Sequence, residues 1–119
     1  MEYGWIDAAA LPLPGAEKDY KAEWDAWRYM VGGKMFAMLG SHKDGRQILS
    51  VKLPPADGIL LREQYADIIP GYYMNKEHWN SIYLDGAVPQ ELAEKMLRTS
   101  HGLILASLPK KTRGAIQGG

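Results

Sequence analysis

Apolar and polar residues alternate along the first half of the chain in the pattern of β-strands. Residues 23–31 alternate in this way, and residues 34–39 form a second apolar run. Gly32-Gly33 between them tolerates the positive φ angles of a tight hairpin turn. The alternation resumes at Arg46, so the pattern predicts three consecutive antiparallel strands. In the third strand the predicted inward residues are Leu49, Val51 and Leu53, and the predicted outward residues are Ser50 and Lys52.

Two segments of the second half have helical spacing instead. Pro54-Pro55 ends the third strand, and Asp57 is suited to cap a helix. After Pro70-Gly71, residues 81–84 predict a further short strand, which ends at the turn Asp85-Gly86. A last helix is predicted from Pro89 to about Ser107. Its apolar stripe comprises Leu92, Met96, Leu103 and Ile104.

These elements predict one α+β domain over residues 1–119. The expected architecture has two layers, an antiparallel sheet of about five strands with helices packed on one face. Prolines and a glycine interrupt residues 11–15, so at most one short helix precedes the folded body, which we place at about residues 15–109. Residues 110–119 are basic and then glycine-rich, and we expect them to form a flexible tail.

Composition and charge limit the function. The chain of 119 residues has 14 Lys and Arg, 14 Asp and Glu, and no cysteine. A neutral chain lacks the overall positive charge that accompanies strong nonspecific phosphate binding, so a nucleic-acid surface would have to be local. The absence of cysteine excludes disulfides and thiolate metal sites. Without a signal sequence or a long apolar segment, we expect a cytoplasmic monomer with no membrane contact.

Catalytic and metal-binding patterns are missing from the sequence. His42, His78 and His101 lie in separate elements without ligand spacing, so we predict no metal site and no cofactor. No serine lies in a nucleophile elbow, and no glycine-rich segment resembles a phosphate loop. We therefore predict no enzymatic activity, although a general-base role for His78 stays open as a third hypothesis.

The segment Tyr72-Tyr73-Met74-Asn75-Lys76-Glu77-His78-Trp79 concentrates aromatic, cationic and amide groups between two strands. Such groups could bind a small ligand, a protein or nucleic acid. The structural alternative is that Trp79 fills the core while Lys76 and Glu77 form a solvated turn. A second candidate surface is cationic and lies on the sheet, with Arg28, Lys34, Arg46 and Lys52. Charges on exposed strands also protect sheet edges from pairing with other chains, so this surface has a structural alternative as well.

The order of several motifs resembles the MmcQ/YjbR family. These motifs are Glu23-Trp24, KMFAML at 34–39, SVKL at 50–53 and, above all, PGYYMNKEHWNSIYLDG from Pro70. The resemblance implies a CyaY-like or double-wing α+β fold, and members of the family are commonly described as DNA-binding proteins. It therefore implies DNA as a partner, contacted through the sheet and its hairpins, with a protein-interaction or small-ligand domain using Asn75–Trp79 as the alternative. The candidate binding residues are Lys34, Arg46, Lys52, Tyr73, Asn75, Lys76, His78 and Trp79.

Overall fold

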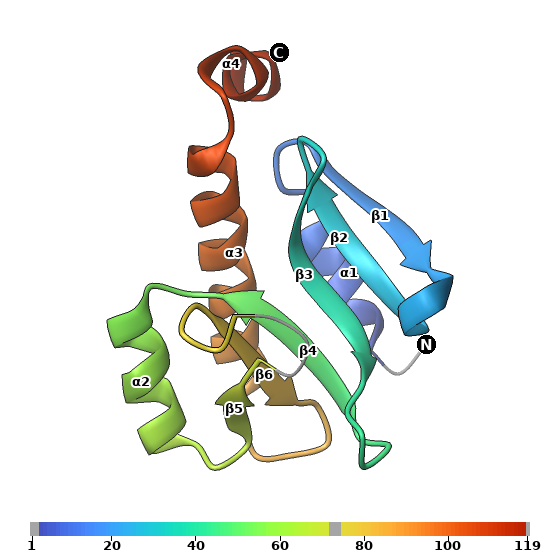
Figure 1. The fold of residues 1–119 in the computed structure, drawn as a ribbon, viewed down its shortest axis with the longest axis vertical. Coiled ribbons are helices and arrows are strands. Elements are labelled where there is room, and N and C mark those ends of the chain that lie inside the picture. The colour runs from blue at the N-terminus through green and yellow to red at the C-terminus, as the bar shows by residue number, and fades with distance from the viewer. Residues whose placement is uncertain (1–2, 72–74, 119) are drawn as a thin grey trace.

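Within residues 3–71 and 75–118, which the computed structural model describes, six strands form one antiparallel sheet in the order β1-β2-β3-β4-β6-β5 (Figure 1). The α+β class with an antiparallel sheet is confirmed, with six strands in place of about five. The strands are β1 (Ala16–Lys21), β2 (Ala26–Val31), β3 (Lys34–Ser41), β4 (Gln47–Lys52), β5 (Ile68–Pro70) and β6 (Trp79–Tyr83). The helices are α1 (Gly4–Ala10), the 3₁₀ helix η1 (Ala22–Trp24), α2 (Pro55–Gln64), α3 (Gln90–Ser107) and α4 (Lys110–Gly118).

Helices α1 and α3 cover one face of the sheet, where the main core lies (Figure 1). The inward residues predicted for the third strand, Leu49 and Val51, are fully buried there. Helix α3 supplies Met96, Leu97 and Ile104 to the same core. Burial of such apolar side chains is the main contribution to the stability of a domain of this size.

The opposite face of the sheet is also closed at its centre. Met38 and Ile48 on this face are fully buried, although they lie outside the main core cluster. Ser50 and Ser81, which pair across β4 and β6, are fully buried as well, and their hydroxyls hydrogen-bond to each other at 2.7 Å. The prediction that Ser50 points outward is therefore right for the face and wrong for its exposure, because burial depends on what covers a face.

Several parts of the fold differ from the prediction. The strand predicted for residues 23–31 is shorter, because η1 and the left-handed Asp25 (φ 49°) precede β2. Strands β1 and β5 were not predicted: the first is mostly polar and the second has three residues. The folded body also begins earlier than residue 15, since Ile6 and Ala10 of α1 are fully buried in the core.

The C-terminal segment, which we expected to form a flexible tail, contains the helix α4. Helix α4 follows α3 directly and packs beside the β2–β3 turn. A Cβ on Gly32 in that turn would lie 2.5 Å from Leu108 and 3.3 Å from Thr112. Ile116 of α4 reaches Gly15 and adds to the edge of the core. Thr112 and Ile116 of α4 therefore lie beside the β2–β3 turn and beside Gly15, respectively.

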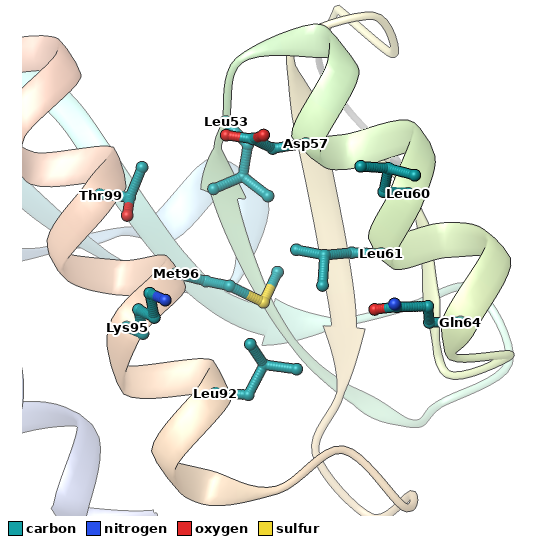
Figure 2. A pocket seen from close by; sticks show the side chains of 9 residues that line it. All are labelled: Leu53, Asp57, Leu60, Leu61, Gln64, Leu92, Lys95, Met96 and Thr99. Carbon is teal, nitrogen blue, oxygen red and sulfur yellow. The ribbon is translucent and has the colours of Figure 1, made fainter.

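Helix α2 lies apart from α3, and a groove separates the two helices (Figure 2). Of the ten residues of α2, Gly58 alone is buried. Gly58 is held against Asn80 of β6, and Arg62 donates a hydrogen bond to the Asn80 side chain. In the part of the chain that the structure describes, no helix is both long and apolar enough to cross a bilayer.

Candidate functional site

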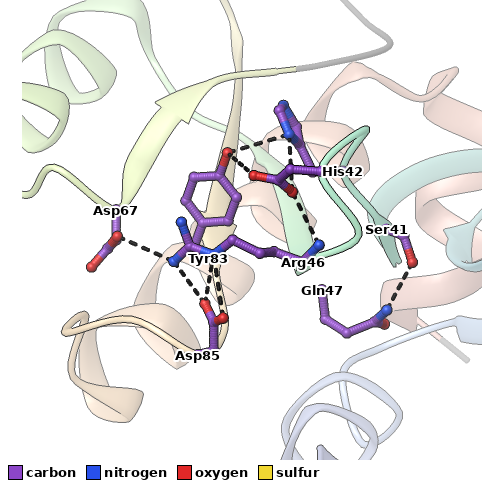
Figure 3. Close-up of polar contacts among 8 residues, drawn as sticks. Ser41, His42, Arg46, Gln47, Asp67, Tyr83 and Asp85 are labelled. Carbon is purple, nitrogen blue, oxygen red and sulfur yellow. Dashed lines mark hydrogen bonds and ion pairs between the residues drawn. The ribbon is translucent and has the colours of Figure 1, made fainter.

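Arg46 is the centre of a polar network at one end of the sheet (Figure 3). Its Nε and Nη2 atoms donate to Asp85 at 3.0 and 2.7 Å, and Nη2 lies 3.5 Å from Asp67. Its guanidinium stacks 3.6 Å from the ring centre of Tyr83. The hydrogen bonds from Arg46 hold the pKa of Asp85 below its usual value, and Asp85 raises the pKa of Arg46. Arg46 is thus engaged within the protein.

His42 and Asp44 complete this network on the β3–β4 turn. The His42 ring packs edge-on against Tyr83, with ring centres 5.5 Å apart, and its Nδ1 lies 3.3 Å from the Tyr83 hydroxyl. The same hydroxyl donates to Asp44 at 3.3 Å. Partial burial raises the pKa of Tyr83, so the hydroxyl stays protonated near neutral pH. These contacts hold the β3–β4 turn against β6, so His42 and Asp44 have a structural role.

Position 86 is occupied by glycine because the Cβ of any other residue would clash with Asp67. A Cβ at this position would lie 2.9 Å from the Cβ of Asp67 and closer still to its carboxylate. The Asp67 side chain has to stay there because its Oδ2 accepts the backbone N–H of Ala87 at 2.9 Å. Gly86 therefore allows the Asp67 side chain to hold the turn after β6.

Backbone contacts order the segment Asn75–Trp79. The Asn75 side-chain oxygen accepts the N–H of Glu77 at 2.9 Å, and its carbonyl oxygen accepts the N–H of Trp79 at 2.9 Å. The carbonyl oxygen of His78 accepts the N–H of Leu53 at 2.8 Å. Asn75 is thus a turn-forming residue. Tyr73, also a candidate, lies outside the described residues.

Lys76 lies at a cleft that the sequence did not suggest. Glu77 and Lys76 are exposed, whereas His78 and Trp79 are partly buried. The cleft has a volume of about 290 Å³. It is lined by His42, Lys43, Ile69, Pro70, Gly71 and Lys76. Among the described residues, the charged side chains that line the cleft are cationic. The cleft lies between a residue of the β3–β4 turn, Lys43, and a segment that contains Lys76, more than thirty positions later in the chain.

The structure does not gather the predicted sheet cations into one patch. Strands β3 and β4 are antiparallel, so Lys34 at the start of β3 and Lys52 at the end of β4 lie toward the same end of the sheet. Arg46 lies at the other end, in its network with Asp85. Arg28 on β2 is likewise paired, with two hydrogen bonds to Asp19. Lys34 is exposed and Lys52 is partly buried.

A stronger basic surface lies at the C-terminal end of the fold. Residues 95–119 contain five Lys or Arg and no Asp or Glu, which leaves nine against 14 in residues 1–94. Helix α4 carries Lys110, Lys111 and Arg113, and its contact with Gly32 brings it beside the turn that precedes Lys34. We call Lys34, Lys110, Lys111 and Arg113 the basic end. The excess of positive charge near the C-terminus can be seen in the sequence, but only the folded structure shows that α4 lies near Lys34.

The remaining histidine is structural. His101 of α3 is only 5% exposed. Its Nε2 lies 2.8 Å from the carbonyl oxygen of Pro14, and its ring packs edge-on against Phe36. Among residues 3–71 and 75–118, no three His, Asp or Glu side chains are grouped so as to hold a metal ion.

Comparison with known proteins identifies the family. The family model YjbR matches residues 11–103. The chain is 33% identical to the protein YjbR of Escherichia coli strain K12 over 103 residues, covering 87% of this chain and 86% of the relative. It is 32% identical to YbdF of Escherichia coli O157:H7, covering 92% and 89%. The crystal structure of Deinococcus radiodurans DR2400 matches with a TM-score of 0.86 and 29% identity, covering 97% of this chain and 87% of that one. The chain belongs to the YjbR family.

Proposed function

We propose that the protein binds DNA through its basic end, by contacts to phosphates that carry little sequence information. The observation that carries this proposal is that Lys110, Lys111 and Arg113 follow one another on α4, in a stretch without Asp or Glu, next to the β2–β3 turn. A neutral protein can bind a polyanion when its charges are segregated, because the field near one end is set by the local charges. DNA binding implied by the family resemblance thus remains the hypothesis, with a different contact surface.

The positions of the lysines in the basic end also favour contacts with phosphates. Lys110 and Lys111 lie in the first turn of α4, where the helix dipole adds to their positive potential. Both are exposed, as is Lys34. Arg113 differs, since its guanidinium donates to the carbonyl oxygen of Ala106 at 3.1 Å. We therefore assign the main phosphate contacts to the three lysines and a partly structural role to Arg113.

Fluorescence anisotropy with a labelled duplex over a salt series tests this proposal. Three phosphate contacts predict a slope of log affinity against log salt of roughly −3, because each contact releases about 0.9 counterion. The double variant Lys110→Gln/Lys111→Gln should weaken binding and reduce the slope by about 2. No detectable binding at low salt, or a slope that the variant leaves unchanged, would refute the proposal.

A matched control comes from the opposite end of the molecule. The variant Lys43→Gln/Lys76→Gln removes the same charge from exposed residues that line the cationic cleft. It should leave the salt slope within about 0.5 of the unmodified protein. If both double variants weaken binding equally, attraction is spread over the surface and the basic end is not the site.

A second candidate function is the binding of a small anion at the cationic cleft. Its volume of about 290 Å³ and its lining by Lys43 and Lys76 support this candidate. Isothermal titration with inorganic phosphate and citrate tests it. Here the roles of the two double variants reverse: Lys43→Gln/Lys76→Gln should abolish binding, and Lys110→Gln/Lys111→Gln should not affect it.

Both candidates are binding functions, and the geometry supports binding over catalysis. A general base needs a partner that orients it. Among the described residues, the His78 side chain makes no hydrogen bond or ion pair, and the groups around Arg46 are engaged with one another. Measurement of the pH dependence of any activity found in an unbiased substrate screen, compared with that of His78→Gln, would test the general-base hypothesis.

A further inference from the structure

The groove between α2 and α3 is a site that neither the resemblance nor the proposed function uses. Its volume is about 300 Å³. The lining comprises Leu53, Asp57, Leu60, Leu61, Gln64, Leu92, Lys95, Met96 and Thr99. In Figure 2, Leu61 of α2 and Met96 of α3 lie at its centre, between the two helices.

Helix α2 is held to the fold in an unusual way. A surface helix normally buries an apolar stripe against its neighbours. Here the fully buried residue of α2 is Gly58, while Ile59 is 50% exposed and Leu60 is 57% exposed. The sheet therefore covers only part of the apolar run Ile59-Leu60-Leu61. Apolar surface beside an unfilled groove marks a place where a further apolar group is stabilised.

The polar residues of the groove define the chemistry of that group. Asp57 belongs to α2 and Lys95 to α3, so a carboxylate and an ammonium lie on opposite walls (Figure 2). No ion pair within 4.0 Å involves either of them in the part of the chain that the structure describes. Both are exposed at the margin of the groove, whereas Leu53 and Met96 are buried at its floor.

We propose that this groove binds a small zwitterion with an apolar side chain, of the size of one large apolar amino acid. The ammonium of the ligand meets Asp57, its carboxylate meets Lys95, and its side chain lies on Leu61, Leu92 and Met96. A volume of about 300 Å³ corresponds to roughly ten water molecules, which matches a ligand of about ten non-hydrogen atoms. A ligand this small in a groove this open binds with a Kd of roughly 0.1–10 mM.

Two-dimensional NMR of the full chain tests the proposal, because it detects millimolar binding residue by residue. L-Leucine and L-phenylalanine are the probes, each titrated to about 50 mM, well above the expected Kd. Shifts should concentrate on Leu61, Leu92 and Met96 and saturate. N-acetyl-leucine lacks the ammonium, leucine amide lacks the carboxylate, and serine lacks the apolar side chain. Each should bind at least about fivefold more weakly than leucine, since each loses one of the three contacts.

The variants Asp57→Asn and Lys95→Gln should each weaken leucine binding by about fivefold. The control Glu91→Gln removes an exposed charge from the same α3 helix outside the groove and should leave Kd unchanged. Absence of saturable shifts in the groove with both amino acids refutes the proposal. Equal binding of leucine and its blocked derivatives refutes the zwitterion class. Groove shifts that depend on protein concentration without ligand would mean that a second copy occupies the site, which also refutes it.

Discussion

The Ser100 hydroxyl of α3 accepts the backbone N–H of Lys52 at 2.8 Å. The same hydroxyl donates to the carbonyl oxygen of Phe36 at 2.6 Å, so one side chain joins a donor of β4 to an acceptor of β3. Ser100 is fully buried, and water cannot easily replace it. This explains why a small hydroxyl residue stands at the point where α3 crosses the two strands.

Replacing Ser100 by alanine should therefore destabilise the fold. The variant leaves a backbone N–H and a carbonyl oxygen without their partner, which costs about 2 kcal/mol in the free energy of unfolding. Urea denaturation measures this change. Ser107→Ala is the control, because Ser107 bonds to a carbonyl oxygen of its own helix at an exposed position, and we expect a change within about 0.5 kcal/mol. Equal effects of the two variants would contradict the bridging role.

Gly86→Ala should destabilise the protein by about 2 kcal/mol, since its Cβ displaces Asp67 from the N–H of Ala87. The cost should shrink in an Asp67→Ala background, where the clash with the carboxylate is removed and only the 2.9 Å contact with the Cβ of residue 67 remains, and a double-mutant cycle by thermal denaturation measures the difference. Gly102→Ala is the comparison, because nothing lies within 4 Å of a Cβ at this exposed helical position. It should stabilise the protein by about 0.5–1 kcal/mol. Additive effects of Gly86→Ala and Asp67→Ala would argue against the clash.

Acid should weaken the contact between α1 and the sheet. Burial acts to raise the pKa of Asp7, but hydrogen bonds from Lys18 and Tyr29, at 2.8 and 2.6 Å, outweigh it and lower this pKa. A carboxyl with a lowered pKa in the folded state stabilises the protein above its unfolded pKa of about 3.9. That stability is lost as the pH falls through the folded value.

Asp7→Asn should accordingly cost about 1 kcal/mol at pH 7 and much less near pH 3, as measured by urea denaturation at both pH values. Glu63→Gln, which changes an exposed carboxyl on α2, should have the same free energy of unfolding as the unmodified protein at both pH values. A cost of Asp7→Asn that does not depend on pH would mean that the ion pair with Lys18 contributes little.

Lys34→Gln isolates the contribution of the β2–β3 turn to DNA binding. It should reduce the salt slope by about 1, as each of the α4 lysines does, if turn and helix contact the same duplex. Anisotropy titrations of this single variant at three salt concentrations are sufficient. An unchanged slope would restrict the DNA contact to α4 alone.

Strong local patterns made the central strands and α3 predictable. The alternation around Leu49 and Val51 specified the inward face of β4. Of the stripe predicted for α3, Met96 and Ile104 are buried, whereas Leu92 and Leu103 are only partly buried. Strand β1, with the sequence AEKDYK, is a polar edge strand, and its pairing with β2 provides the only reason for its conformation. Local sequence carries no signal for an element of this kind.

The candidate site was less predictable, because its residues depend on distant contacts. Arg46 looked like a free sheet cation, and only the fold brings it to Asp85, 39 positions later. Lys76, a candidate binding residue, is exposed, but its neighbours His42 and Lys43 at the cleft come from another hairpin. Backbone geometry explains Asn75 and Gly86. Part of the motif that carries the family resemblance therefore consists of residues that tight turns require.

Helix α3 also constrains how the molecule can assemble during synthesis. The helix follows every strand in sequence, yet it bridges β3 and β4 through Ser100 and meets the segment after α1 through His101. When the nascent chain has emerged only as far as β6, α1 alone covers the apolar side of the sheet. We therefore expect stable folding to require the whole of α3, up to residue 107, because its side chains complete the core.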